Sequence, residues 1–246
     1  MTEFIIHKPA SGPDTAPMFK TLLLAATVVH FSAVPEAQAA EPLFTGANLD
    51  AFECRPGSWV IEDGALTCRM EDVKDRKGNV RKRGMGYIWT REEYSDFVLT
   101  LTYRLSEAAN SGVFFRTDKD NPVQGGFEIQ LLDNAGYARK RGAAISPKNS
   151  NGALYDAVAP TAGPGKPAGQ WNTFRLTCKG SKIRVEINGI QTVEADIDQW
   201  KHAGRNPDGS KNKFKTALKD LPRTGRIGFQ NHGQVVWIRD VEIRRL

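Results

Sequence analysis

The segment from residue 97 to 105, FVLTLTYRL, constrains the fold most strongly, because apolar side chains occupy every second position in it. A period of two places these side chains on one face of a β-strand, whereas an amphipathic helix requires a period of 3.6 residues. Thr100, Thr102 and Arg104 fall on the opposite face of this strand. We therefore predict a long strand that packs one face on a core.

Short strands separated by turn residues are predicted along most of the chain. Asp63-Gly64 and Asn188-Gly189 each lie between two strand-like segments, and both dipeptides are typical of two-residue hairpin turns. The other predicted strands are 110–118, 125–133, 171–180, 182–189, 190–197, 226–233 and 235–246. Only a weak helical turn is predicted near 196–202. This pattern predicts an all-β fold, and at this length a jelly-roll sandwich of two antiparallel sheets.

The N-terminal segment has the order of a secretory signal peptide. A basic residue, Lys20, precedes an apolar run from 22 to 34, and the small residues Ala37 and Ala39 follow. We predict a signal peptide over residues 1–39, with Met18 as an alternative start and cleavage after Ala39. The apolar run is short for a bilayer span, so no membrane association is expected after cleavage. The mature chain, 40–246, is predicted to be one periplasmic or secreted domain.

Charge and cysteine content argue against several classes of function. The net charge of +6 is concentrated in the segments 74–83 and 211–219, which we interpret as solvated surface loops rather than as a nucleic-acid site. The three cysteines, Cys54, Cys68 and Cys178, allow one internal disulfide at most, and Cys54 with Cys68 is the nearer pair. Their spacing matches neither a metal site nor a thiol nucleophile.

Two irregular segments, 161–170 and 200–225, are longer than hairpin connections require. Loops of this length in a compact domain usually have a function or are mobile. We expect them to border a groove.

Unexpected polar side chains lie on one face of three predicted strands. By alternation, Arg116 shares a face with Phe114, Glu128 with Gln130, and Gln230 with His232. If these strands are neighbours, one surface presents Arg116, Glu128, Gln130, Gln230 and His232, with Tyr155 and Trp171 beside it. Amides, Arg and carboxylate bind sugar hydroxyls, and aromatic rings pack on the apolar face of a pyranose. Each residue alone is more often solvated or structural, so the prediction depends on their coincidence.

The order of these motifs resembles the 3-keto-disaccharide hydrolase family, formerly a domain of unknown function. The motifs are NSGVFFR at 110–116, GFEIQLLD at 126–133, GALY at 152–155, Trp171-Asn172, Asn188-Gly189 and GFQNHG at 228–233. The likeness covers residues 42–246. It implies an exported protein with a jelly roll of the concanavalin-A-like lectin/glucanase type. It also implies cleavage of 3-keto-glycosides or 3-keto-disaccharides, in which a glucose unit is oxidised to a ketone at C3.

The implied chemistry needs a base, a group that stabilises an oxyanion, and an acid for the leaving oxygen. The ketone acidifies the hydrogen on C2, so that proton abstraction, elimination at C1 and addition of water give net hydrolysis. We assign Glu128 or His232 as the base, with the other as the acid, and Arg116, with Gln130 or Gln230, as the groups that stabilise the oxyanion. The substrate-binding residues would be Gln130, Gln230, Asn110, Tyr155 and Trp171. A divalent metal ion held by Glu128 and His232 is an alternative to Arg116.

Two other functions are compatible with the same residues. A lectin-like module would bind glycan in the same groove without turnover. A conventional glycosidase would need a second carboxylate roughly 5 to 9.5 Å from the first. Asp133 has the opposite parity to Glu128, so it serves only if a bulge intervenes. The residues predict no particular aglycone or oligomeric state.

Overall fold

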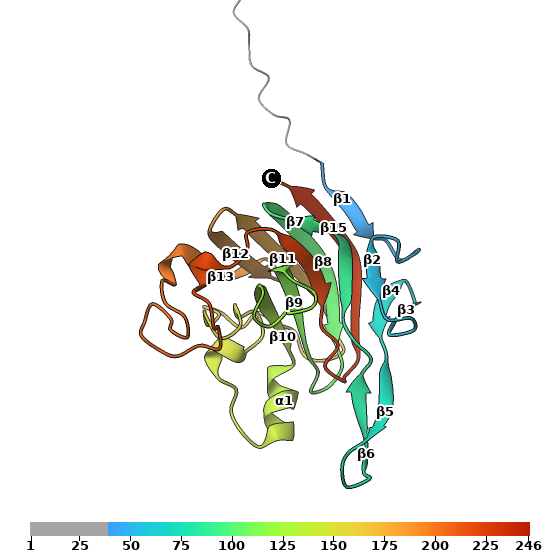
Figure 1. Ribbon diagram of the computed structural model, residues 1–246. Helices are drawn as coiled ribbons and strands as arrows, with labels where there is room; N and C mark the ends of the chain where they lie inside the picture. Colours follow the sequence, from blue (N-terminus) through green and yellow to red (C-terminus); the bar gives the residue numbers. More distant parts are fainter. Residues whose placement is uncertain (1–38) are drawn as a thin grey trace, which may run out of the picture. The chain divides into compact units, whose positions relative to one another are not determined.

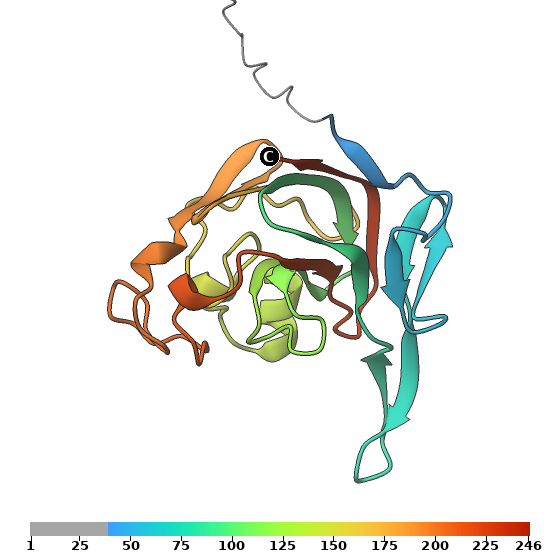
Figure 2. The ribbon, with the colours of Figure 1, turned by 45° about the horizontal axis from the view of Figure 1, so that its top comes forward.

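The computed structural model describes residues 39–246, which form two antiparallel β-sheets packed face to face (Figures 1 and 2). The predicted signal peptide lies, apart from Ala39, outside the described residues. One sheet consists of β13 (Ile190–Asp196), β12 (Lys182–Ile187), β11 (Trp171–Lys179), β8 (Phe97–Leu105), β15 (Val236–Arg245), β4 (Ala65–Cys68) and β3 (Trp59–Glu62), and β1 (Glu41–Phe44) pairs with β15. The other consists of β10 (Phe127–Leu132), β9 (Asn110–Thr117), β14 (Gly225–Phe229), β7 (Ile88–Tyr94) and β2 (Phe52–Cys54). The predicted two-sheet jelly-roll sandwich is confirmed.

The core between the sheets follows the alternation read from the sequence. Leu99 and Tyr103 of β8 are fully buried, and they belong to one apolar cluster with Val113 of β9 and Ile129 of β10. Because alternate side chains point to opposite faces, the other face of the five-stranded sheet is left for residues that are not part of this core. The long predicted strand at 97–105 is confirmed.

Both predicted hairpin turns are confirmed. Asp63 and Gly64 join β3 to β4 with φ of 50° and 71°, and Asn188 and Gly189 join β12 to β13 with φ of 51° and 76°. Two consecutive residues with positive φ define the type I′ turn, whose twist suits a two-residue hairpin.

The basic segment 74–83 is exposed, as predicted, but it is a loop only at 75–79. It belongs to a two-stranded hairpin of β5 (Met70–Lys74) and β6 (Val80–Gly84), which projects from the sandwich (Figure 1). Cross-strand ion pairs join Lys82 to Asp72 and Arg83 to Glu71. These strands pack against no core, so their sequence lacks the apolar alternation that identifies the others.

The helix α1 (Asn134–Arg141) was also not predicted, because its sequence is polar and contains a glycine. The Asp133 side chain accepts a hydrogen bond from the Gly136 amide at 3.2 Å and begins the helix. Gly142, with φ of 65°, ends it. The weak turn expected near 196–202 is the 3₁₀ turn η2 (Ile197–Gln199), and η1 (Pro147–Asn149) and η3 (Leu218–Asp220) are similar. Between residues 39 and 246, no helix is long and apolar enough to cross a bilayer.

The three cysteines are free thiols. Cys54 lies on β2 and Cys68 on β4, in different sheets, and the Cys68 thiol donates to the Gln234 carbonyl at 3.2 Å. Burial raises the pKa of Cys68 to about 11 and that of Cys178 to about 12. The buried thiols of Cys68 and Cys178 are therefore part of the core. No disulfide joins Cys54 to Cys68.

Candidate functional site

The three strands that carry the predicted polar residues are neighbours, in the order β10-β9-β14. Glu128 of β10 and Gly228 of β14 both lie opposite Phe114 of β9, so the three share one face of the five-stranded sheet. We call this the polar face; it is the face turned away from the core. Its predicted members Glu128, Gln130 and Gln230 are brought together there.

Glu128 is the buried acid of the polar face, with 6% of its surface exposed. Its Oε1 accepts a hydrogen bond from Gln230 Nε2 at 3.2 Å, and its Oε2 lies 3.5 Å from Lys213 Nζ. Burial raises the pKa of this carboxyl, and the Lys213 ammonium opposes that rise. A carboxylate with a raised pKa is a stronger base than a solvated one, as general-base catalysis requires.

Lys213 comes from the long segment 200–225, at a position interpreted from the sequence as a solvated loop. Its backbone amide donates to Asp156 Oδ2 at 2.6 Å, and its carbonyl accepts from Gln124 Nε2 at 3.0 Å. Its ammonium lies 4.0 Å from the centre of the Tyr155 ring. Burial lowers the pKa of Lys213, while Glu128 raises it. The interpretation as a solvated loop is therefore wrong here, because Lys213 of this segment contacts Glu128 and Tyr155.

Gln230 links the acid to an aromatic cluster. Its Nε2 also lies 3.3 Å from the Tyr87 hydroxyl. The rings of Tyr87, Trp89 and Phe114 have centroids 5.5 to 5.8 Å apart. Position 228 must be a glycine, because a Cβ there would lie 2.1 Å from the Trp89 ring. Tyr87 and Trp89 were not predicted, since an aromatic residue in a strand is usually part of a core.

Gln130, Asn110 and Tyr155 lie together next to Glu128. All three line a hollow of about 290 Å³ with Tyr137 and Arg141 of α1. Gln130 is 4% exposed, and its Nε2 donates to the Asn149 carbonyl at 3.2 Å. The structure therefore places these three residues close to Glu128, as predicted.

Arg116 does not face Glu128, so the expected shared face with Phe114 is wrong. Three residues of β14, from Arg226 to Gly228, oppose four of β9, from Phe114 to Thr117, which is a β-bulge, and Arg116 has φ of 48°. Its fully buried guanidinium donates to the Ser95 carbonyl at 2.7 Å, the Gly180 carbonyl at 2.7 Å and Asp96 Oδ1 at 2.9 Å. Arg116 therefore ties chain segments together.

Arg116→Met is expected to reduce the free energy of unfolding by about 3 kcal/mol, because buried acceptors lose a charged donor. Urea unfolding measures this loss. The exposed Arg175→Met is the matched control, with an expected change within about 0.5 kcal/mol. Activity per folded molecule should stay within about twofold of wild type in both variants, since Arg116 does not contact the polar face. A rate loss of the size expected for an oxyanion-stabilising group, on the order of 100-fold, would contradict this placement.

His232 and Trp171 are not joined to Glu128. His232 follows β14, its side chain is exposed, and within the described part of the chain it makes no side-chain hydrogen bond or ion pair. Trp171 begins β11 in the other sheet, where the guanidinium groups of Arg104 and Arg239 lie 4.8 and 4.2 Å from the centre of its ring. The expectation that Trp171 flanks the polar face is wrong, because alternation predicts a face within a sheet but not the sheet to which a strand belongs.

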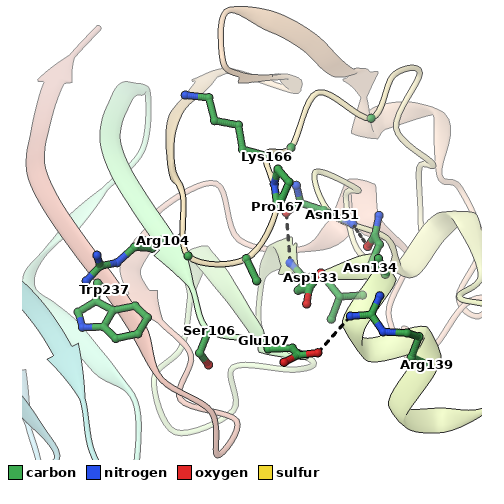
Figure 3. Close-up of a pocket in the computed structure, with 16 residues that line it drawn as sticks. Arg104, Ser106, Glu107, Asp133, Asn134, Arg139, Asn151, Lys166, Pro167 and Trp237 are labelled. Carbon is green, nitrogen blue, oxygen red and sulfur yellow. Dashed lines mark hydrogen bonds and ion pairs between the residues drawn. The ribbon is translucent and has the colours of Figure 1, made fainter.

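Within residues 39–246, the hydrogen bonds and ion pairs of the Glu128 side chain involve no second carboxylate, and the Asp156 carboxylate instead accepts from the Lys213 backbone amide. Asp133 accepts from the Ala108 amide at 2.8 Å and lines a separate cavity of about 840 Å³, shown in Figure 3, which Glu128 does not line. Among residues 39–246 there is no group of three or more His, Cys, Asp or Glu that could hold a metal ion. The arrangement is therefore one buried carboxylate paired with one ammonium, a combination suited to moving a proton and stabilising an oxyanion.

Comparison with known proteins gives matches over nearly the whole described chain. Residues 39–244 match the profile of a family described as 3-keto-alpha-glucoside-1,2-lyase-like domain. A curated protein of Bacteroides thetaiotaomicron, named 3-keto-disaccharide hydrolase, is 25% identical over 212 residues, which are 78% of this chain and 71% of that protein.

Solved structures agree with these matches. A candidate glycosyl hydrolase of Parabacteroides distasonis is 31% identical, with a TM-score of 0.73 over 85% of this chain and 100% of that chain. The laminarinase catalytic domain of Thermotoga maritima is 12% identical, with a TM-score of 0.51 over 86% of this chain and 98% of that one, and shares the fold alone.

Proposed function

Because this chain belongs to the 3-keto-alpha-glucoside-1,2-lyase-like domain family, we propose that it cleaves glycosides whose glucose unit carries a ketone at C3. The observation that carries the proposal is the ion pair of the buried Glu128 with the half-buried Lys213, with Gln230 donating to the same carboxylate. The related protein named 3-keto-disaccharide hydrolase supports the same substrate class. The sequence analysis predicted that Arg116 stabilises the oxyanion. In this proposal Lys213 has that role.

The first step is removal of the C2 proton by the Glu128 carboxylate. The C2–H electron pair forms a C2=C3 double bond, and the C3 oxygen becomes an enediolate oxygen. The Lys213 ammonium stabilises this negative charge, which is absent from the ground-state ketone. Gln230 holds Oε1 by its amide, so Glu128 presents a fixed orientation to the substrate.

Cleavage follows from the same electron pair. The enediolate collapses to restore the C3 ketone, a C1=C2 double bond forms, and the glycosidic C1–O bond breaks. The leaving oxygen takes the proton that Glu128 now carries. Water then adds across the double bond, with its hydroxyl on C1 and a proton on C2, and the net reaction is hydrolysis. Such a sequence accounts for both a lyase and a hydrolase name in the same family.

A turnover assay tests the proposal. The purified protein should release free sugar or aglycone from a 3-keto-glucoside and leave the unoxidised parent glucoside intact. Equal cleavage of both substrates would indicate a conventional glycosidase. Binding of the keto substrate without release of product would indicate a lectin-like module. Either result would overturn the proposed reaction.

Gly112→Ala should lower kcat/KM on the keto substrate by about tenfold, because positional errors of an ångström in a catalytic group are costly. A Cβ at this position would lie 2.3 Å from Glu128 Oε1 and 2.9 Å from its Cγ, so the carboxylate must move. Gly112 has no positive φ, so the contact and not backbone strain is the cause. Gly163→Ala, which has open space around it, is the matched control and should leave kcat/KM unchanged. Steady-state kinetics of both variants would show whether Gly112→Ala lowers kcat/KM while Gly163→Ala does not.

Export is also part of the proposal, on the strength of Lys20, the apolar run at 22–34 and the small residues before Ala40. N-terminal sequencing of the protein recovered from outside the cytoplasm of an expressing bacterium should begin at Ala40. A mature chain that retains residues 18–39 would contradict cleavage at this position.

A further inference from the structure

The hollow of about 290 Å³ between β10 and α1 has no role in the mechanism above. It adjoins the polar face, because Gln130 lies two residues from Glu128 on the same strand. Tyr155, which also lines it, contacts the Lys213 ammonium with its ring. The hollow is therefore adjacent to the reacting groups and can hold part of a ligand.

Gln130 and Asn110, which line this hollow, each carry a buried amide oxygen that has no hydrogen-bond partner among residues 39–246. Gln130 Nε2 donates to the Asn149 carbonyl, which fixes the orientation of the amide and leaves Oε1 as an unpartnered acceptor. Asn110 Oδ1 is likewise buried without a partner, on the neighbouring strand β9. Buried acceptors without donors are unfavourable and uncommon in folded proteins. A ligand that satisfies both must bring hydrogen-bond donors.

We propose that this hollow is the subsite for the departing sugar ring of a disaccharide substrate, an inference that rests on the proposed function. Its volume of about 290 Å³ is just below the range of roughly 300–1,000 Å³ for small-molecule sites, which suits a single ring. Sugar hydroxyls supply the donors for Gln130 Oε1 and Asn110 Oδ1, and the guanidinium of Arg141 supplies donors for ligand oxygens. Glu128 does not line the hollow, so the ring held there is not the ring that loses its C2 proton.

The geometry assigns Gln130 as a specificity-determining residue for the leaving group. Gln130→Met keeps the length of the side chain and removes both the Oε1 acceptor and the Nε2 donor to the Asn149 carbonyl. This variant should lower kcat/KM for a 3-keto-disaccharide by roughly 10- to 100-fold, because the departing ring loses a buried hydrogen bond. A 3-keto phenyl glucoside has no hydroxyls on its leaving group, and its kcat/KM should change by less than about threefold. The exposed Gln199→Met is the matched control, with both substrates unaffected.

A binding measurement keeps this inference separate from the proposed reaction. Ligand-observed NMR titration of free glucose, galactose and fructose should show at least one sugar bound by the wild type, with an affinity at least about tenfold weaker in Gln130→Met and Asn110→Leu. Thermal unfolding of both variants verifies that they fold. The absence of sugar binding by the wild type, or an equal loss of kcat/KM on both keto substrates, would overturn the subsite. Sugar binding that needs Gln130, in a protein that cleaves no keto substrate, would instead refute the proposed function alone.

Discussion

Glu128→Gln is expected to lower kcat on a 3-keto-glucoside by about 1,000-fold, which is within the range that a positioned general base contributes. The amide of glutamine keeps the size of the side chain but cannot accept the C2 proton. KM should change little, because the lost interaction is with the transition state rather than with the ground state.

The same variant should leave the fold intact. Burial raises the pKa of Glu128, so the folded state binds the proton more tightly than the unfolded chain does. Ionisation of this carboxyl therefore reduces stability as pH rises through the interval between the two pKa values. Replacing the carboxylate with a neutral amide removes that cost, but it also leaves the Lys213 ammonium without its partner. Because these two effects on stability oppose each other, the melting temperature at neutral pH should change by only a few degrees. The exposed Glu194→Gln is the control for activity and should match wild type. A Glu128→Gln protein that is folded and retains a tenth or more of the wild-type kcat would show that another group is the base.

Lys213→Met should lower kcat by about 100-fold and shift the acidic limb of the pH–rate profile to higher pH. The rate loss reflects removal of one charged group from the developing oxyanion. The shift follows from the pKa of Glu128, which burial raises and the Lys213 ammonium lowers. Glu128 must be deprotonated to act, so activity rises as pH rises through its pKa. Without Lys213 that pKa is higher, and more alkaline solution is needed to reach the same fraction of active enzyme.

The exposed Lys211→Met, two residues away in the same segment, is the matched control. It removes one positive charge from the loop but none from the polar face, so its pH–rate profile should overlay that of the wild type. Equal shifts in both variants would attribute the effect to the charge of the loop in general. No shift in Lys213→Met would mean that the ammonium does not act on the base.

The sequence predicted the sandwich because its strands obey a local rule. Alternation identified β8, and paired turn residues with positive φ identified the β3–β4 and β12–β13 hairpins. The grouping of Glu128, Gln130 and Gln230 was also predictable, since each position follows from its parity once β10, β9 and β14 are neighbours.

Other parts of the site depend on tertiary interactions, which no local sequence pattern predicts. A β-bulge turns the Arg116 side chain away from the polar face. In the structure this bulge is marked by the positive φ of Arg116, which the residue type does not predict. Lys213 is one of several basic residues in its segment, and hydrogen bonds from distant Gln124 and to Asp156 select it to face Glu128. Trp171 has the residue type expected at a sugar site but lies in the other sheet. Sequence parity predicts which residues share a face, whereas tertiary contacts decide which loop covers it.

Exchange of the C2 hydrogen tests the central claim most directly, namely that the buried Glu128 removes this proton. A 3-keto-glucoside is incubated with the enzyme in deuterated water, and NMR follows deuterium at C2 in the recovered substrate and in the released 3-keto sugar. The mechanism predicts that the released sugar carries deuterium at C2 when the wild type acts, after a correction for uncatalysed exchange. Glu128→Gln should give no enzyme-dependent incorporation. Release of 3-keto sugar by the wild type with its original hydrogen at C2 would contradict proton abstraction and require direct displacement at C1.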